Sequence, residues 1–155
     1  MIPEEMRVRH AGTGDIRFLV GARAEMFSSM GVVDQVMAWR EAAADWFENH
    51  LDDESVGVFI AEREGKAASC AVGVLHACIP GPDVDGLLDV EISNVYTSEW
   101  ARGSGCARAV MTALLNWARD RGAVRAKLNA TDQGQPLYTS LGFVMTRCPA
   151  MKRSL

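Results

Sequence analysis

The sequence has no apolar run approaching the roughly 20 residues that a membrane-spanning helix requires. Its first residues, Met-Ile-Pro-Glu-Glu, are acidic rather than basic, which is untypical of a secretory signal peptide. The net charge is −4, and no cluster of Lys and Arg stands out, so no nucleic-acid-binding surface is predicted. We therefore expect a cytoplasmic protein that binds neither a membrane nor nucleic acid.

Metal-ligand patterns are also missing. The four cysteines and three histidines form no Cys-x-x-Cys pair and no cysteine-histidine spacing of the kind that holds zinc. We therefore predict no metal cofactor. The cysteines, at positions 70, 78, 106 and 148, are expected to be free thiols, because a reducing cytoplasm keeps them unpaired.

What the sequence contains is typical of a folded domain. Hydrophobic residues make up 48% of the chain and charged residues 23%, and both values are ordinary. A chain of 155 residues is long enough to bury a core without disulfides or metals, and no linker, repeat or low-complexity segment divides it. We predict a single domain over residues 1–155.

Hydrophobic periodicity predicts strands and helices in a mixed order, so the expected fold class is α/β (α+β). Helices are expected from Asp15, as the N-cap, to Met30-Gly31, and over 33–50, 105–122 and 136–142. Strands are expected at 7–10, 55–62, 67–78, 88–97, 124–130 and 143–146, with a last one at 151–155. The 55–62 and 67–78 strands are expected to form a hairpin across Glu64-Gly65. Residues 79–86, rich in Pro and Gly, are expected to form a loop.

A glycine-containing turn, Arg102-Gly103-Ser104-Gly105-Cys106-Ala107, joins the 88–97 strand to the next helix. Two glycines let the backbone turn tightly and approach a ligand closely, since no Cβ stands in the way. The first amides of the helix are unpaired and lie at the positive end of its dipole. Such a turn is typical of a phosphate or pyrophosphate site, so we predict a cofactor that carries these groups.

Two common phosphate-binding motifs are excluded. No Gly-Lys-Ser/Thr is present, as a P-loop requires, and Arg108 stands where a dinucleotide-binding fingerprint has its third glycine. The turn does match Arg-x-x-Gly-x-Ala. Further along, Leu137-Tyr138-Thr139-Ser140-Leu141-Gly142-Phe143 matches Leu-Tyr-x-x-x-Gly-Phe. In this order the two elements resemble those of the GNAT superfamily of acetyl-CoA-dependent N-acetyltransferases.

The resemblance implies a central mixed, largely antiparallel sheet of about six to seven strands, flanked by about four helices. The sheet would splay open at a parallel pair, which the 88–97 strand, the next helix and the 124–130 strand supply as one βαβ crossover. By resemblance, the cosubstrate acetyl-CoA lies in the opening. Its pantetheine arm would pair with backbone groups of Val95 and Thr97. Its pyrophosphate would contact the amides of Arg102, Gly103, Ser104, Gly105, Cys106 and Ala107.

Two positions depart from the family pattern. Thr131 stands where relatives commonly have Asn, and Gly134 stands where they have Ala. Thr131 can still form hydrogen bonds, so we expect cofactor binding to be retained.

Acetyl transfer to an amine requires two proton movements. Only the neutral amine attacks a thioester, so a base must take its proton; the leaving thiolate, with a parent pKa of about 8.5, is helped by an acid. Tyr138 matches the tyrosine that is this acid in the family. Glu91, in phase with Ser93 and Val95 on its strand, is the candidate base; the alternative is a solvated edge-strand carboxylate. Asn94 would face the other way, unless a bulge of the kind that the family often has there rephases the strand. A backbone N–H near Val95 would polarise the thioester carbonyl.

The predicted function is therefore an N-acetyltransferase that moves the acetyl group of acetyl-CoA to a primary amine of a small molecule, peptide or protein. The alternative is an inactive acyl-CoA-binding sensor or partner subunit; Tyr138 favours catalysis.

Met26, Phe27 and Met30 either line an acceptor pocket or fill the core. The four tryptophans are expected to pack in the core. The resemblance also allows a homodimer, for which no residue is diagnostic.

Overall fold

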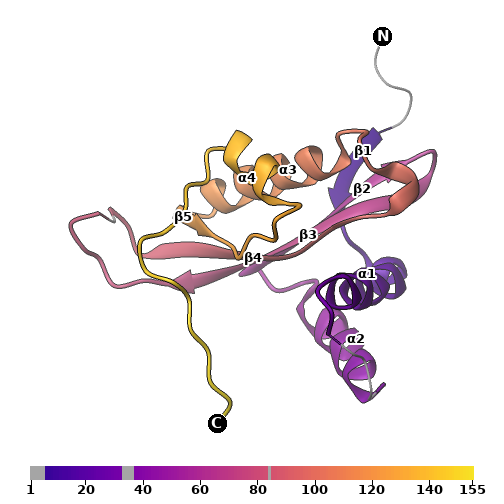
Figure 1. Ribbon diagram of the computed structural model, residues 1–155, viewed down its shortest axis with the longest axis horizontal. Helices are drawn as coiled ribbons and strands as arrows, with labels where there is room; N and C mark the ends of the chain where they lie inside the picture. The colour runs from indigo at the N-terminus through magenta and orange to yellow at the C-terminus, as the bar shows by residue number, and fades with distance from the viewer. Residues whose placement is uncertain (1–5, 33–36, 84) are drawn as a thin grey trace.

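A five-stranded sheet divides the computed structural model, which describes residues 6–32, 37–83 and 85–155, into two helical layers. The strand order is β1-β2-β3-β4-β5; β4 and β5 are parallel and all other pairs are antiparallel. Helices α3 and α4 cover one face of the sheet, and α1 and α2 lie against the other (Figure 1). The elements are β1 (Met6–His10), η1 (Thr13–Asp15), α1 (Ile16–Ser29), α2 (Ala38–His50), β2 (Val56–Arg63), β3 (Lys66–Ala77), β4 (Leu88–Thr97), η2 (Glu99–Ala101), α3 (Cys106–Asp120), β5 (Ala123–Lys127) and α4 (Gln135–Ser140).

This arrangement confirms the predicted fold class and the parallel strand pair. It also confirms the hairpin between β2 and β3, whose turn residues Glu64 and Gly65 both have positive φ. The helix expected after the glycine turn is α3, and Gly122, with φ of 95°, follows its last turn as a left-handed cap. Local turn chemistry therefore determines these boundaries.

Two separate hydrophobic clusters form the core, one on each face of the sheet. The cluster beneath α3 includes Val110, Met111 and Leu114 of that helix, together with Val90 and Ile92 of β4. The cluster beneath α1 and α2 is built around Leu19, Phe47, Ile60, Cys70 and Val72. Both faces of the central strands are therefore buried.

The close packing of α3 on the sheet depends on Gly57 in β2. A Cβ added to Gly57 would lie 2.7 Å from an atom of the Trp117 ring, which α3 holds against the sheet. We expect Gly57→Ala to lower the free energy of unfolding by about 1–3 kcal/mol, because the half-buried ring must move. Gly21→Ala, in α1 with no atom within 4 Å of the added Cβ, should instead be neutral or stabilising by up to about 1 kcal/mol. Urea denaturation of both variants measures the difference; equal stabilities would contradict the prediction.

Asp15 is the N-cap residue of α1, as predicted, but its side chain does not play the capping role. Asp15 ends the short helix η1, and its side chain makes no capping bond to α1. Its carboxylate instead accepts a hydrogen bond from the Gly12 amide at 2.8 Å and pairs with the Arg9 guanidinium at 2.7 Å. The hydrogen bonds from Arg9 hold the pKa of Asp15 below its ordinary value, against the opposing effect of burial. The carboxylate therefore joins β1 to the start of α1.

The second helix begins at Ala38 among the described residues. Its predicted start, at residue 33, lies outside them. The end at His50 agrees with the prediction, and Phe47 is buried against the sheet.

Strand β4 contains a bulge at Asn94, where φ is 54° and the register with β3 shifts. Ser93 and Asn94 both line a cavity on the α1–α2 face, whereas Val95 packs into the cluster beneath α3. The expectation that Val95 shares a face with Glu91 and Ser93 is therefore wrong, because the extra residue reverses the alternation.

The strands predicted at 143–146 and 151–155 are absent from the described chain, so the sheet has five strands rather than six to seven. The segment after Phe143 runs away from the body of the protein (Figure 1). Val144, Met145 and Met151 are exposed, so this segment buries too little apolar surface to offset the entropy cost of ordering a strand. The fifth strand is also shorter than predicted, since it ends at Lys127.

In the part of the chain that the structure describes, no helix is long and apolar enough to cross a membrane. The same residues contain no group of three or more His, Cys, Asp or Glu side chains that could hold a metal ion.

Candidate active site

The glycine turn connects η2 to α3 through two left-handed residues. Gly103 has φ of 77° and Gly105, the N-cap of α3, has φ of 86°. Side chains other than Asn and Asp rarely adopt these angles, so the sequence permits this path because both positions are glycine. A Cβ added to Gly103 would meet no atom within 4 Å, so open space lies beside the turn.

Side chains within and beside the turn fix its shape. The Ser104 hydroxyl donates to the carbonyl of Ala101 and lies 3.1 Å from the Cys106 sulfur, which is buried in the core. Arg102 donates from Nε to the carbonyl of Thr97 at 3.2 Å. The turn is thus held to the end of β4 on one side and to the core on the other.

The turn offers a set of unpaired backbone donors. Among the described residues, the amides from Gly103 to Ala107 have no hydrogen-bond acceptor, and the first paired amide of this turn is that of Ala109, bound to the Gly105 carbonyl. Unpaired amides at the positive end of a helix of this length attract anions. The residues present therefore fit a phosphate or pyrophosphate group.

The sheet opens next to this turn. The parallel pairing of β4 with β5 stops at Glu91, opposite Lys127, although β4 continues to Thr97. Within the described chain, the later part of β4 therefore has no strand partner on that side. Val95 lies in this stretch, and so does Thr97, whose hydroxyl lies 2.9 Å from that of Ser69. This opening is where the resemblance predicts the pantetheine arm.

Tyr138 lies on α4, next to the start of α3. Its side chain belongs to the cluster beneath α3, and only 9% of the residue is exposed. The centroids of its ring and of the Phe143 ring are 5.9 Å apart. Arg108 of α3 donates to the Ser140 hydroxyl at 2.6 Å, which ties α4 to the glycine turn. A Cβ on Gly134 would lie 2.8 Å from the Tyr138 ring, so a larger residue at position 134 would clash with the ring.

The state of the Tyr138 hydroxyl suits a proton donor. Burial raises the pKa of this phenol above its ordinary value, so it is protonated at neutral pH. Within the described chain the hydroxyl has no hydrogen-bond partner. It is therefore free to donate to a ligand.

Glu91 lies on the opposite face of the sheet from the cluster that holds Tyr138. Its side chain is 65% exposed, and Oε2 lies 3.6 Å from Nε2 of His76 on the neighbouring strand. These two residues border a cleft of about 320 Å³ together with Asp89 and Lys127. Glu91 is thus a solvent-accessible carboxylate on the α1–α2 face of the sheet.

Asp89, on the same face, is already paired. Although burial alone would raise its pKa, hydrogen bonds from Lys127 at 2.9 Å and Arg125 at 3.3 Å hold it below its ordinary value. Glu91 therefore is the less constrained carboxylate of the two.

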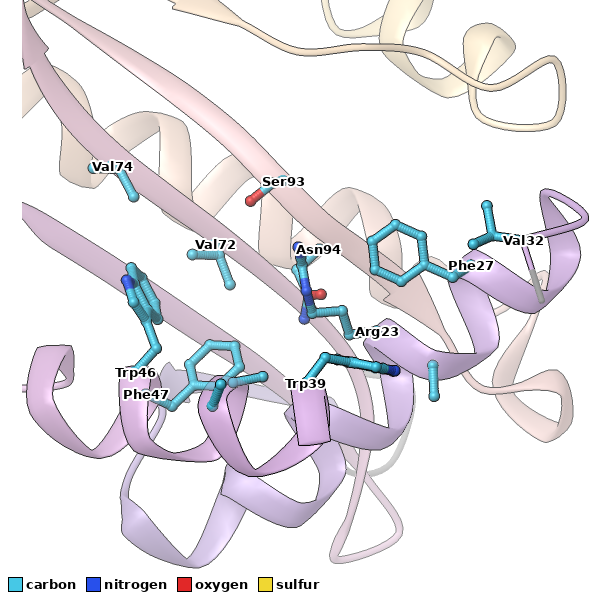
Figure 2. A pocket seen from close by; sticks show the side chains of 13 residues that line it. Arg23, Phe27, Val32, Trp39, Trp46, Phe47, Val72, Val74, Ser93 and Asn94 are labelled. Atoms are coloured by element: carbon cyan, nitrogen blue, oxygen red, sulfur yellow. The ribbon is translucent and has the colours of Figure 1, made fainter. Parts of the chain in front are cut away.

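A much larger cavity, of about 770 Å³, lies between the sheet and helices α1 and α2 (Figure 2). Phe27 lines this cavity, which agrees with the pocket-lining alternative predicted for Met26, Phe27 and Met30. The two methionines do not line it. The lining residues are Arg23, Ala24, Phe27, Val32, Trp39, Ala42, Ala43, Trp46, Phe47, Val72, Val74, Ser93 and Asn94.

Trp39 and Trp46 are packing residues, as predicted, and they also line the cavity, which was not predicted. Their rings pack against Phe27 and Phe47 respectively, each nearly edge to face. Arg23, Ser93 and Asn94 were not predicted as site residues. For Arg23 the available signal was its spacing of one helical turn from Phe27 on α1. For Asn94 it was the bulge that the family resemblance allows at this position.

Comparisons with known proteins agree with this geometry. A model of the acetyltransferase (GNAT) family matches residues 24–143. A predicted acetyltransferase from Clostridium acetobutylicum, solved with acetyl-CoA, has a TM-score of 0.83 and 25% identity, and the match covers 96% of each chain. A GCN5-related N-acetyltransferase from Ralstonia eutropha JMP134 also has a TM-score of 0.83 and 25% identity, over 97% of this chain and 98% of that chain.

An aminoglycoside N-acetyltransferase, AAC(6')-Iy, solved in complex with CoA, shares the fold with a TM-score of 0.78 and 18% identity, over 99% of both chains. Comparison with curated proteins finds no match. The family model covers most of the sequence. The structures from Clostridium acetobutylicum and Ralstonia eutropha share the fold of this chain over nearly their whole length. The chain belongs to the acetyltransferase (GNAT) family.

Proposed function

We propose that the protein is an N-acetyltransferase that moves the acetyl group of acetyl-CoA directly to a primary amine. The observation that carries this proposal is the run of unpaired amides from Gly103 to Ala107 beside the open edge of β4. An anion-binding turn next to an unpaired strand edge suits a ligand with a pyrophosphate at one end and amide groups along its length.

Two sets of residues would hold acetyl-CoA. The turn amides from Gly103 to Ala107 would bind the pyrophosphate, and the backbone of β4 around Val95 and Thr97 would pair with the pantetheine arm. The amide of Arg102, also predicted to contact the pyrophosphate, already donates to the Glu99 carbonyl at 3.3 Å. Acetyl-CoA supplies an acetyl group activated as a thioester. Cys106 is buried in the core, so the proposal needs no covalent intermediate on this thiol.

The protons follow a simple path. The acceptor ammonium loses a proton to Glu91, directly or through water, and the neutral nitrogen forms a bond to the acetyl carbon as the carbon–sulfur bond breaks. The Tyr138 hydroxyl gives its proton to the leaving sulfur, and the resulting phenolate takes the second proton of the acetylated nitrogen, directly or through water. Glu91 releases its proton to solvent, so one proton leaves for each acetyl group transferred. A backbone N–H near Val95 would stabilise charge on the carbonyl oxygen. The products are the N-acetylated amine and coenzyme A.

The cavity between α1, α2 and the sheet is the proposed acceptor site. It reaches β4 at Ser93 and Asn94, next to the residues proposed to bind the pantetheine arm. Val74 also lines it and lies opposite Glu91 in the β3–β4 register, so the proposed base stands at the edge of this cavity.

The direct test is calorimetric titration with acetyl-CoA, combined with thiol-reagent detection of coenzyme A released from a panel of amines. Binding together with amine-dependent release supports the proposal. Binding without release by any amine favours the alternative, an acyl-CoA-binding sensor or partner subunit. No binding at millimolar acetyl-CoA rejects both.

Glu91→Gln tests the proposed base. Because general base catalysis contributes about 10²-fold or more, we expect kcat/KM for the amine at neutral pH to fall by about that factor, with the Kd of acetyl-CoA unchanged. The loss should shrink as the pH approaches the amine pKa of about 10.4, since the neutral amine then no longer needs a base. Glu48→Gln, an exposed carboxylate on α2, is the matched control. A loss that is independent of pH would contradict the role.

A further inference from the structure

The proposed acceptor cavity has an unusual balance of charge. Of its described lining residues, Arg23 alone carries a charge, and most of the others are apolar or aromatic. No described carboxylate lies within ion-pair distance of the Arg23 guanidinium. An arginine in this setting offers a fork of donors for a carboxylate, and the apolar surroundings strengthen the pairing.

Among the described residues, Arg23 is held by packing rather than by a counter-charge. Its guanidinium carbon lies 5.0 Å from the centroid of the Phe27 ring, one turn further along α1. The side chain is only half-buried, and Figure 2 shows it extending from α1 toward Asn94. The cation is thus kept near the wall of the cavity that the sheet forms.

The walls facing Arg23 favour a flat apolar ligand. Trp46 and Phe47 of α2, with Val72 and Val74 of β3, surround the inner part of the cavity (Figure 2). Aromatic rings prefer edge-to-face or offset contacts with another ring, and these contribute beyond burial alone. A volume of about 770 Å³ accommodates such a ligand with room to spare.

The described lining contains no carboxylate that could pair a second or third ammonium group. An amine with several positive charges would meet Arg23 and aromatic surfaces without a counter-charge. This composition disfavours polycationic acceptors.

We propose that the acceptor is a primary amine attached to an aromatic or bulky apolar group and bearing a carboxylate, which Arg23 binds. This inference rests on the proposed function, because it assigns the acceptor of the same transfer reaction. Arg23 is here a specificity-determining residue, and the aromatic side chains of the cavity provide the apolar contact.

The test compares acceptors that differ only in the carboxylate. L-Phenylalanine is paired with phenethylamine, and 4-(aminomethyl)benzoate with benzylamine, so that two spacings between amine and carboxylate are sampled. We expect at least one carboxylate acceptor to exceed its partner in kcat/KM by about tenfold or more, since a charge-assisted hydrogen bond of about 1.5–3 kcal/mol corresponds to that factor. L-Alanine, which lacks the ring, should be a poor acceptor, and kanamycin should not be acetylated.

Three variants assign the preference to Arg23. Arg23→Gln should remove it, Arg23→Lys should retain part of it, and Arg17→Gln, an exposed arginine on α1 outside the cavity, should leave it unchanged. Thermal unfolding of each variant verifies that the fold is kept. A preference that survives Arg23→Gln, or equal rates for the paired acceptors in the unaltered protein, overturns the inference.

Calorimetry separates this inference from the proposed function. If acetyl-CoA binds and kanamycin or benzylamine is the best acceptor, the N-acetyltransferase stands and the acceptor class is wrong. If acetyl-CoA does not bind, the proposed function fails. The same paired amines are then titrated into the protein alone, where equal affinities, or affinities unaffected by Arg23→Gln, also overturn the assignment of the cavity.

Discussion

Replacing Tyr138 with phenylalanine is expected to lower kcat about 100-fold or more, because a positioned general acid contributes about 10²–10⁴-fold. The Kd of acetyl-CoA should stay the same, since the ring keeps its packing against Phe143 and only the hydroxyl is lost. Stability should change little, because within the described chain that hydroxyl makes no hydrogen bond. A tyrosine with a raised pKa remains protonated across the neutral range, so the loss should be uniform there.

The measurement is steady-state release of coenzyme A, combined with calorimetry of acetyl-CoA. Tyr96→Phe is the matched control, since Tyr96 is the other tyrosine of the chain and its ring packs on the opposite face, against Phe18. Full activity in Tyr138→Phe would show that the leaving group takes its proton elsewhere. Loss of binding together with activity would make Tyr138 a structural residue of the cofactor site.

Gly103→Asp is expected to weaken acetyl-CoA binding at least tenfold compared with Gly103→Asn. Asn and Asp both tolerate the left-handed conformation, and an added Cβ meets no atom within 4 Å, so the two variants have the same backbone cost. They differ in one negative charge next to the amides proposed to bind pyrophosphate. A unit charge at about 5–6 Å from two others costs on the order of 1.5–6 kcal/mol between the dielectric constant of bulk water and that typical of a protein surface.

Titration with acetyl-CoA at low and high salt checks this expectation. The gap between the variants should narrow as salt rises, because exposed charges are screened. Near-equal affinities at low salt would mean that the turn does not hold the charged part of the ligand.

Most of the fold and part of the site could be predicted because they depend on interactions between residues that are close in sequence. The turn glycines, the hairpin at Glu64-Gly65 and the βαβ crossover depend on residues close in sequence, and all lie where the pattern predicts. The motif around Tyr138 is also local. The role of Glu91 as a base stays a prediction, since its position on the sheet does not test proton transfer.

The unpredicted features depend on distant contacts. Asp15 would be an ordinary N-cap if Arg9 and the Gly12 amide did not engage its carboxylate. The segment from residue 143 has strand-forming residues, but strand formation depends on a partner edge rather than on propensity. Tryptophan is typical of packed interiors. Trp39 and Trp46 line a cavity because α1 and α2 stand apart from the sheet, and this spacing depends on tertiary packing.

The bulge at Asn94 has a consequence for how this protein can diversify. Because Ser93 and Asn94 face the α1–α2 cavity while Val95 faces α3, the two proposed binding specificities are carried by different layers of the molecule. Substitutions in α1 and α2 can therefore alter acceptor choice while leaving the glycine turn and Tyr138 untouched. When the protein is evolved in the laboratory to accept new amines, the selected substitutions should therefore lie mainly in α1 and α2. The layer proposed to bind acetyl-CoA, with α3 and α4, should stay unchanged.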